Sequence, residues 1–290
     1  MPAEMRIGPP TLRVRDLQKQ LSFYENDLGL QVSQNIRTSD DLETVELGFK
    51  GKFKEDKEPL LILKHDPNAK EASHNFAGLY HFAILVPDRK SLASAYFAIA
   101  NSSIHFDGFA DHLVSESLYL HDPEYNGIEI YRDKPRDQWQ HDEKGRIIMD
   151  TLPLDLRSLL EELSNDERKN ITFPNGGKIG HMHLRVTNLA KSSQFYRNLG
   201  FDVTVDMSAM GAIFLSTGGY HHHLGMNTWH SLDGRTHVKG EAGLDLFEII
   251  VPESFIETIQ KGFGDKIQER KKNQLLISDP DGVQILIKSN

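Results

Sequence analysis

An internal repeat constrains the fold of this 290-residue chain more than any other feature of its sequence. Residues 13–24 read RVRDLQKQLSFY and residues 185–196 read RVTNLAKSSQFY, with Arg, Val, Leu, Lys, Phe and Tyr in common. A Leu-Gly pair follows shortly afterwards in each copy, at residues 28–29 and 199–200. Glycine just after an amphipathic segment typically ends a helix. Each copy therefore predicts a strand, a helix with an aromatic pair, and a second strand.

A second pair of segments repeats in the same way. HFAILVPD at 81–88 aligns with LFEIIVPE at 246–253, and DPEYNGIEI at 122–130 aligns with DPDGVQILI at 279–287. Asp-Pro followed by Asn or Gly marks a tight turn between two strands. The chain thus contains four modules, each of which predicts the order β-α-β-β-β. We number them one to four along the chain, with approximate bounds 7–66, 78–133, 178–232 and 243–288.

A long polar segment separates the two halves of the chain. Residues 134–177 are rich in charged side chains and contain one helical pattern, around residues 154–163. A connection of this length is unusual inside a compact domain. We therefore expect a first tandem of modules at 1–133, a connector with a short helix at 134–177, and a second tandem at 178–290.

Composition narrows the classes of function. The net charge is −9, which argues against nucleic acid or an anionic membrane as a partner. The sequence has no signal-like start and no apolar run of transmembrane length, so we expect a cytoplasmic protein. Cysteine is absent, which excludes disulfides and thiol catalysis. Histidine, by contrast, occurs fourteen times.

Four such modules resemble the vicinal oxygen chelate superfamily of glyoxalases, bleomycin resistance proteins and extradiol dioxygenases. The features that carry the resemblance are the helix ends FYENDLG and FYRNLG of modules one and three and the Asp-Pro turns before the last strands of modules two and four. Within it, the chain is most similar to the bacterial catechol 2,3-dioxygenase type, over nearly its whole length. The resemblance implies an α+β fold in which four βαβββ modules form two incompletely closed eight-stranded β-barrels. It also implies metal ligands on the first and last strands of a module.

The repeat alignment shows which modules can supply such ligands. Along the chain, the first-strand position is occupied by Pro9, His81, His181 and Leu246. The last-strand position is Glu129 in module two and Leu286 in module four. Modules two and three thus offer His81, Glu129 and His181. Two histidines and one carboxylate are typical of non-haem Fe(II) oxygenases, although Mn(II) would accept the same ligands.

These three ligands come from opposite sides of the connector. We therefore predict that module two pairs with module three, and module one with module four, within a single chain. A homo-oligomer that joins the modules in trans is the alternative.

The resemblance also implies residues around the metal. Tyr119 and His112 match positions that line the substrate pocket of extradiol dioxygenases, and His222 matches a pocket histidine that handles protons. His183, two residues after His181, should face the same side of its strand and contact substrate, as should Tyr131 beside Glu129. Alternation along residues 221–223 leaves the opposite phase open, in which His221 and His223 point inward. Rings such as Phe82, Phe214 and Trp229 would pack against the substrate.

The function implied is that of an Fe(II)-dependent extradiol dioxygenase of aromatic hydrocarbon catabolism. It would act on catechol or a substituted catechol with O2 and give a 2-hydroxymuconic semialdehyde-type product. Three alternatives stay open: a glyoxalase-like metal-dependent lyase or isomerase, a hydroquinone dioxygenase, and a non-enzymatic small-molecule binding protein. The first would need a fourth ligand on the last strand of module three, where this chain has histidines.

Overall fold

The computed structural model describes residues 5–37, 42–50, 58–71 and 75–289. By its internal contacts the chain divides into two compact units. The first unit comprises residues 1–15, 66–80 and 180–290, and the second comprises residues 16–65 and 81–179. The predicted division into tandems at 1–133 and 178–290 stays a prediction.

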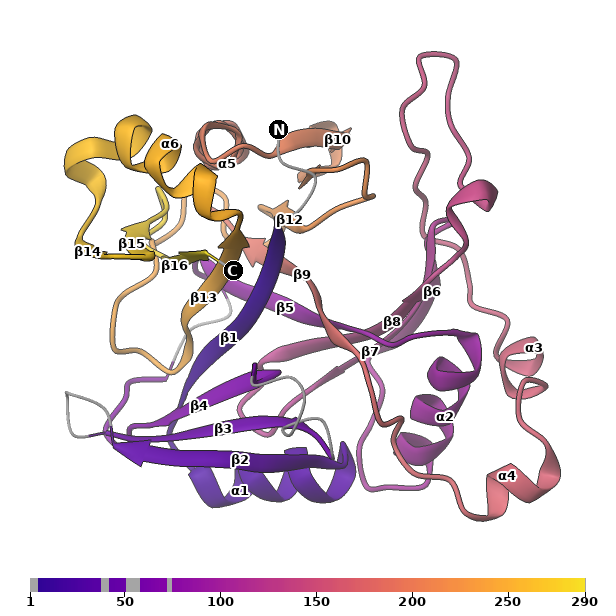
Figure 1. Cartoon of the computed structure of the whole chain (residues 1–290). Coiled ribbons are helices and arrows are strands. Elements are labelled where there is room, and N and C mark those ends of the chain that lie inside the picture. The colour runs from indigo at the N-terminus through magenta and orange to yellow at the C-terminus, as the bar shows by residue number, and fades with distance from the viewer. Residues whose placement is uncertain (1–4, 38–41, 51–57, 72–74, 290) are drawn as a thin grey trace. The chain divides into compact units, whose positions relative to one another are not determined.

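The predicted βαβββ order is confirmed in all four modules (Figure 1). Module one contains β1 (Arg6–Val14), α1 (Leu17–Leu21), β2 (Leu30–Arg37), β3 (Glu43–Phe49) and β4 (Leu61–His65). Module two contains β5 (Gly78–Leu85), α2 (Arg89–Ala100), β6 (Gly108–Asp111), β7 (Ser115–His121) and β8 (Gly127–Asp133). Module three contains β9 (Lys178–Arg185), α5 (Leu189–Asn198), β10 (Asp202–Met207), β11 (Ala212–Ser216) and β12 (Leu224–Asn227). Module four contains β13 (Gly243–Val251), α6 (Glu253–Phe263), β14 (Glu269–Lys271), β15 (Gln274–Ser278) and β16 (Gln284–Ser289).

The strands form two mixed eight-stranded sheets, which confirms the expected α+β fold. One sheet has the order β14-β15-β16-β13-β1-β4-β3-β2, and the other has the order β10-β11-β12-β9-β5-β8-β7-β6. Strands of modules two and three therefore belong to one sheet, and strands of modules one and four to the other, as predicted. Within each module the first and last strands are parallel where the register is recorded: β5 with β8, β12 with β9 and β13 with β16.

Helices begin where the sequence supplies a capping side chain. Asp88 accepts a hydrogen bond from the backbone N–H of Ser91 at the start of α2, and Asn188 accepts one from Lys191 at the start of α5. In the second unit α2 packs beside β8 and buries Leu92 completely (Figure 1). The helix expected around residues 154–163 is present as α3 (Leu156–Leu160), and it is followed by α4 (Asn165–Lys169), which was not expected.

The FY and Asp-Pro motifs prove to be two ends of one hydrogen bond. In the second unit the Tyr24 hydroxyl donates to Asp122 Oδ2 at 3.0 Å, and in the first unit Tyr196 donates to Asp279 Oδ2 at 3.0 Å. Both tyrosines are fully buried. The other carboxylate oxygen of each aspartate accepts backbone N–H groups of its own turn. The helix of one module thus holds the turn that leads into the last strand of the next module.

We call each of these Tyr–Asp hydrogen bonds a tyrosine clamp. The clamp at Asp279 contains a carboxyl group with an unusual pKa. Burial, together with the nearby charge of Asp281, raises the pKa of Asp279 from 3.8 to about 7. Between these two values the folded protein holds a proton that the unfolded chain releases. The free energy of unfolding therefore falls as the pH rises from about 4 to about 7.

We predict that Asp279→Asn flattens the dependence of stability on pH. Urea unfolding of the wild type at pH 5 and pH 8 should show a loss of stability at pH 8, and the variant should show a smaller loss. The control is Asp142→Asn, which changes a partly exposed carboxyl whose pKa is lowered, mainly by hydrogen bonds from Arg146, so that it titrates below this range. Equal pH dependence in Asp279→Asn and wild type would show that the buried clamp does not carry this proton.

Candidate metal centre

Strand pairing in the second unit brings a histidine and a glutamate together. His81 lies on β5 and Glu129 on the parallel neighbour β8. Nε2 of His81 is 2.9 Å from Oε2 of Glu129, and both side chains are almost completely buried. Phe82 follows His81 in the strand and therefore faces the opposite side of the sheet, so its expected role against substrate is wrong.

A serine fixes the carboxylate of Glu129. The Ser117 hydroxyl on β7 donates to Oε1 of Glu129 at 2.6 Å, so that Oε2 is the oxygen that faces His81. Ile128 and Ile130, which flank Glu129, are buried on the other face of β8. Alternation along the sequence GIEIY thus places one acidic side chain on an otherwise apolar strand. Partners of this kind orient metal-binding carboxylates in known metalloproteins.

In the first unit, β9 carries the third side chain. His181 is 1 % exposed, and its ring centroid lies 4.2 Å from that of His222. His81, Glu129 and His181 each offer one ligand atom, and these atoms lie within 4.8 Å of one another. Among the residues that the structure describes, this is the one group of three or more His, Cys, Asp or Glu side chains so placed.

The donor set fits a divalent transition metal. Two donors that bind one ion through bonds of about 2.1 Å at right angles lie about 3 Å apart, and His81 and Glu129 present theirs at 2.9 Å. Imidazole and carboxylate together suit iron or manganese rather than copper(I). The residues therefore could hold a metal ion, and their chemistry does not choose between Fe(II) and Mn(II).

His112 and Tyr119 form a hydrogen-bonded pair in the second unit. Nδ1 of His112 is 2.8 Å from the carbonyl oxygen of Asp150, which can only accept, so Nδ1 carries a hydrogen. In neutral His112, Nε2 therefore accepts from the Tyr119 hydroxyl, 2.7 Å away. The Tyr119 ring in turn lies 5.7 Å from that of His81. The connector thus sets the tautomer of a histidine next to the proposed ligand.

The three consecutive histidines of module three separate into two groups. Nδ1 of His221 lies 2.7 Å from Nδ1 of His222, and both rings neighbour His181. His223 instead hydrogen-bonds Ser216 through Nδ1 at 2.8 Å and packs beside Tyr220. A role of His223 in substrate binding stays a prediction, as does the choice of His222 over His221.

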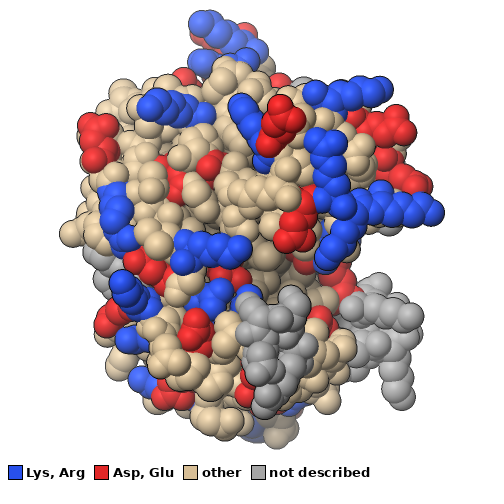
Figure 2. Space-filling view, turned by 90° about the vertical axis from the view of Figure 1, so that its left-hand side faces the viewer, with Lys and Arg blue, Asp and Glu red and all other residues tan. Residues whose placement is uncertain are grey.

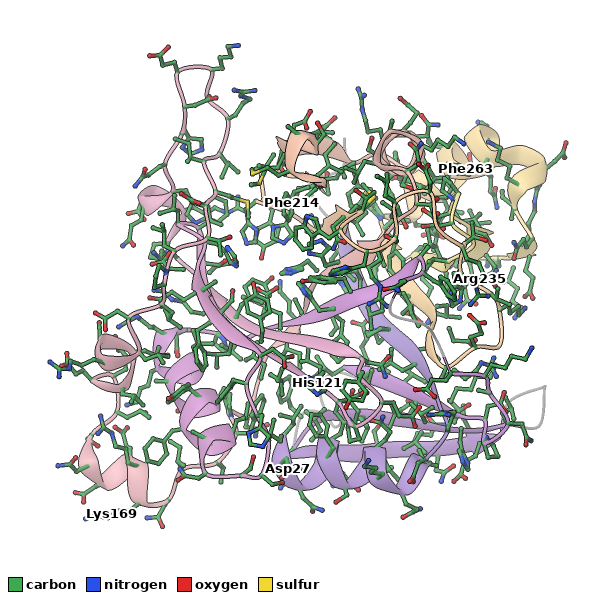
Figure 3. The ribbon with its side chains drawn as sticks, turned by 180° about the vertical axis from the view of Figure 1, so that it is seen from behind. Asp27, His121, Lys169, Phe214, Arg235 and Phe263 are labelled. Atoms are coloured by element: carbon green, nitrogen blue, oxygen red, sulfur yellow. The ribbon has the colours of Figure 1, made fainter. Side chains whose placement is uncertain are left out.

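His183 lies among aromatic rings in the first unit. It neighbours Tyr80, Phe214 and Trp229, with ring centroids 4.9 to 5.9 Å away. Phe214, which is labelled in Figure 3, also has its ring centroid 5.1 Å from that of His222. A Cβ on Gly225 would stand 2.9 Å from Nδ1 of His183, so the position requires glycine. Tyr131 is completely buried, on the face of β8 that carries Glu129.

Two supporting residues escaped the sequence interpretation. Ser117 lies two residues before Tyr119 on the same strand face, and this alternation was the available signal. Asn227 donates through Nδ2 to Nε2 of His183 at 3.1 Å. Its pairing across two strands could not be read from sequence spacing.

On the face shown in Figure 2, lysine and arginine side chains of the described residues are interspersed with aspartate and glutamate. Among the described helices, none has both the length and the apolar character needed to span a membrane.

Comparison with known proteins decides the family. The family model described as "Glyoxalase/Bleomycin resistance protein/Dioxygenase superfamily" matches residues 6–130 and 178–237. The chain belongs to this superfamily. It is 39 % identical to the catechol-2,3-dioxygenase of Bacillus subtilis (strain 168) over 283 residues, which cover 96 % of this chain and 94 % of the relative.

Solved structures of other superfamily members share the fold. Glyoxalase I from Zea mays superposes with a TM-score of 0.59 at 15 % identity, over 99 % of this chain and 92 % of that one. A provisionally assigned dioxygenase from Bacillus subtilis subsp. subtilis str. 168 superposes with a TM-score of 0.66 at 12 % identity, over 98 % of this chain and 84 % of that one. At these identities the likeness concerns the fold alone.

We predict that Ser117→Ala weakens metal binding roughly tenfold or more, because Glu129 loses the donor that orients it. The measurement is a competitive titration of metal-loaded protein with a chelator. The matched control is Ser115→Ala, which removes a buried hydroxyl from the same strand, opposite Asp133 rather than beside Glu129. Equal metal affinity in the two variants would remove Ser117 from the site.

Proposed function

We propose that this protein is an Fe(II)-dependent extradiol dioxygenase that opens the ring of catechol or a substituted catechol with O2. The product would be of the 2-hydroxymuconic semialdehyde type. The observation that carries the proposal is the buried group of two histidines and one carboxylate in a chain homologous to a catechol-2,3-dioxygenase.

His81, Glu129 and His181 would hold the metal ion. Three protein ligands of this kind are typical of sites that leave positions open for substrate and dioxygen. When bound, Fe(II) supplies the redox chemistry that joins the diol to O2. The protein's own groups bind and orient the substrate, exclude water and move protons.

The pair formed by Tyr119 and His112 is suited to proton transfer from the catechol. In the neutral pair the tyrosine hydroxyl donates to Nε2 of His112. When a catechol hydroxyl donates its proton to the Tyr119 oxygen, the tyrosine proton can pass to His112. Asp150, through its carbonyl oxygen, holds the imidazole in the orientation that this transfer needs.

His222 would be the second acid–base group. Because its Nδ1 is engaged with His221, Nε2 is the atom at which it would exchange a proton with substrate. His183 and Tyr131 would line the ring of the substrate, His183 with Phe214 and Trp229 beside it. The neutral tautomer of His183, with Nε2 accepting from Asn227, would direct its Nδ1 hydrogen over Gly225.

The set of three ligands favours an extradiol dioxygenase over two of the three alternative functions. A glyoxalase-like lyase would use a fourth protein ligand, whereas the group found among the described residues contains three. A binding protein without a metal has no use for a carboxylate buried beside two histidines, which is costly unless a cation compensates it. A hydroquinone dioxygenase would share all three ligands, and the nature of the product distinguishes it.

We predict that protein loaded anaerobically with Fe(II) turns yellow on addition of catechol and air, as the ring-fission product forms. Glu129→Gln should lose both iron and activity, because the amide cannot supply the charge that compensates the ion. Glu143→Gln, which changes an exposed carboxylate of the connector, should retain both. If iron binds fully and none of a panel of catechols is opened, the dioxygenase assignment is wrong.

A further inference from the structure

The internal repeat places two arginines at equivalent positions, Arg13 and Arg185, and the structure gives them opposite surroundings. The guanidinium of Arg13 donates to Asp66 at 2.8 Å and to Asp245 at 2.8 Å. Although burial alone would lower its pKa, these two carboxylates raise it. Arg13 is thus a buried cation that two anions neutralise.

Arg185, also in the first unit, has no such compensation. Its Nε donates to the backbone oxygen of Phe76 at 3.2 Å, and among the described residues no carboxylate lies within ion-pair distance of its guanidinium. Burial is the main cause that lowers the pKa of Arg185, and an electrostatic contribution from Tyr80 acts against it. A half-buried cation without an anionic partner is destabilising, so an arginine kept in this state suggests a charge that comes from a ligand.

The strand directs Arg185 to the side of the metal ligand. His181, His183 and Arg185 alternate along β9 with Met182 and Leu184, which are completely buried on the opposite face. Four steps along the strand separate the Cα atoms of His181 and Arg185 by roughly 13 Å. His183 lies midway between them on the strand, and its ring neighbours those of Phe214 and Trp229.

The order of these groups along β9 matches the parts of one catechol that carries a side chain. A catechol bound at His181 would extend along the rings beside His183, and a side chain on its ring would point to the guanidinium. Arginine binds a carboxylate through two parallel hydrogen bonds, which no neutral substituent can replace. An apolar substituent would not pair with the guanidinium, which would keep the surroundings that it has in the free protein.

We propose that Arg185 binds the carboxylate of the substrate's side chain, and that the substrate class is catechols with a short acidic side chain. This inference rests on the proposed function for the reaction, but the binding of an acid at Arg185 can be tested without turnover. The repeat supplies its control, because Arg13 occupies the equivalent position with a structural partner set.

The first measurement compares 3,4-dihydroxyphenylacetate with neutral 4-ethylcatechol as substrates of the iron-loaded enzyme. Arg185→Met should lower kcat/KM for the acid about 10- to 100-fold, the effect of a lost charge-assisted hydrogen bond. Most of that loss should appear in KM. For 4-ethylcatechol kcat/KM should change less than about threefold, and Arg185→Lys should fall between wild type and Arg185→Met for the acid. Equal losses for both substrates would overturn the proposal.

The second measurement uses monophenols, which the reaction does not open. 4-Hydroxyphenylacetate should raise the thermal unfolding temperature of the wild type more than 4-ethylphenol does, and Arg185→Met should abolish that difference. This arm decides the role of Arg185 even if no catechol is cleaved. Ring opening of catechol, combined with no preference for the acid, would refute the inference and leave the proposed function standing.

Stability provides the comparison with Arg13. Arg13→Met should lower the unfolding temperature, since it removes the guanidinium that pairs with the carboxylates of Asp66 and Asp245. Arg185→Met should leave the unfolding temperature unchanged or raise it, because it removes an uncompensated charge. A drop as large as that of Arg13→Met would mean that Arg185 is a structural residue tied to Phe76.

Discussion

Burying the carboxylate of Glu129 inside strand β8 costs free energy that the groups around it must offset, and the site is organised by this requirement. Ser117 donates to one oxygen, and His81 lies against the other. A bound divalent cation would compensate the charge of this carboxylate directly, and it would also make use of His181. Metal binding and the stability of this part of the strand are therefore linked.

The same fold supports the site through a second, purely structural interaction. Tyr24 and Tyr196 each hold the aspartate of an Asp-Pro turn, and the turn at Asp122 leads directly into β8. Glu129 follows Asp122 by seven positions, so the hydrogen bond from Tyr24 fixes where the ligand strand begins. The turn at Asp279 has the same clamp but leads to Leu286, in a module that lacks ligands. Both copies of the repeat thus contain the Tyr–Asp hydrogen bond, whereas only one copy has a metal-ligand residue, Glu129, on the strand that follows.

Much of this architecture could be predicted from sequence because it repeats. The βαβββ order of all four modules followed from comparing the copies with one another. The resemblance to the superfamily added the strand positions of metal ligands, and with them the repeat predicted the grouping of His81, Glu129 and His181 and the pairing of modules two and three in one sheet. Strand alternation was less informative for His221 to His223, because three identical residues do not show which of them points inward. Their separation depends on the hydrogen bond between His223 and Ser216 and on the contacts of His221 and His222 with His181, which are set by tertiary structure.

Other parts of the site depend on hydrogen-bond partners that could not be predicted from the sequence. Ser117, Asn227 and the carbonyl of Asp150 act across strand pairs or from the connector, at sequence separations of 12, 44 and 38 residues from the groups they bind. Arg185 shows a different limit of sequence analysis. The repeat aligns it with Arg13, and only the structure shows that no described residue around Arg185 takes the place of the two aspartates of Arg13.

We expect one chain to hold one metal ion through His81, Glu129 and His181. Crystals of Fe(II)-loaded protein, measured on both sides of the iron absorption edge, test this expectation. A single anomalous peak per chain should appear, bonded at about 2.1 Å to a nitrogen of each histidine and to Oε2 of Glu129. A peak bound by other residues, or iron at full occupancy without Glu129 among its ligands, would contradict it.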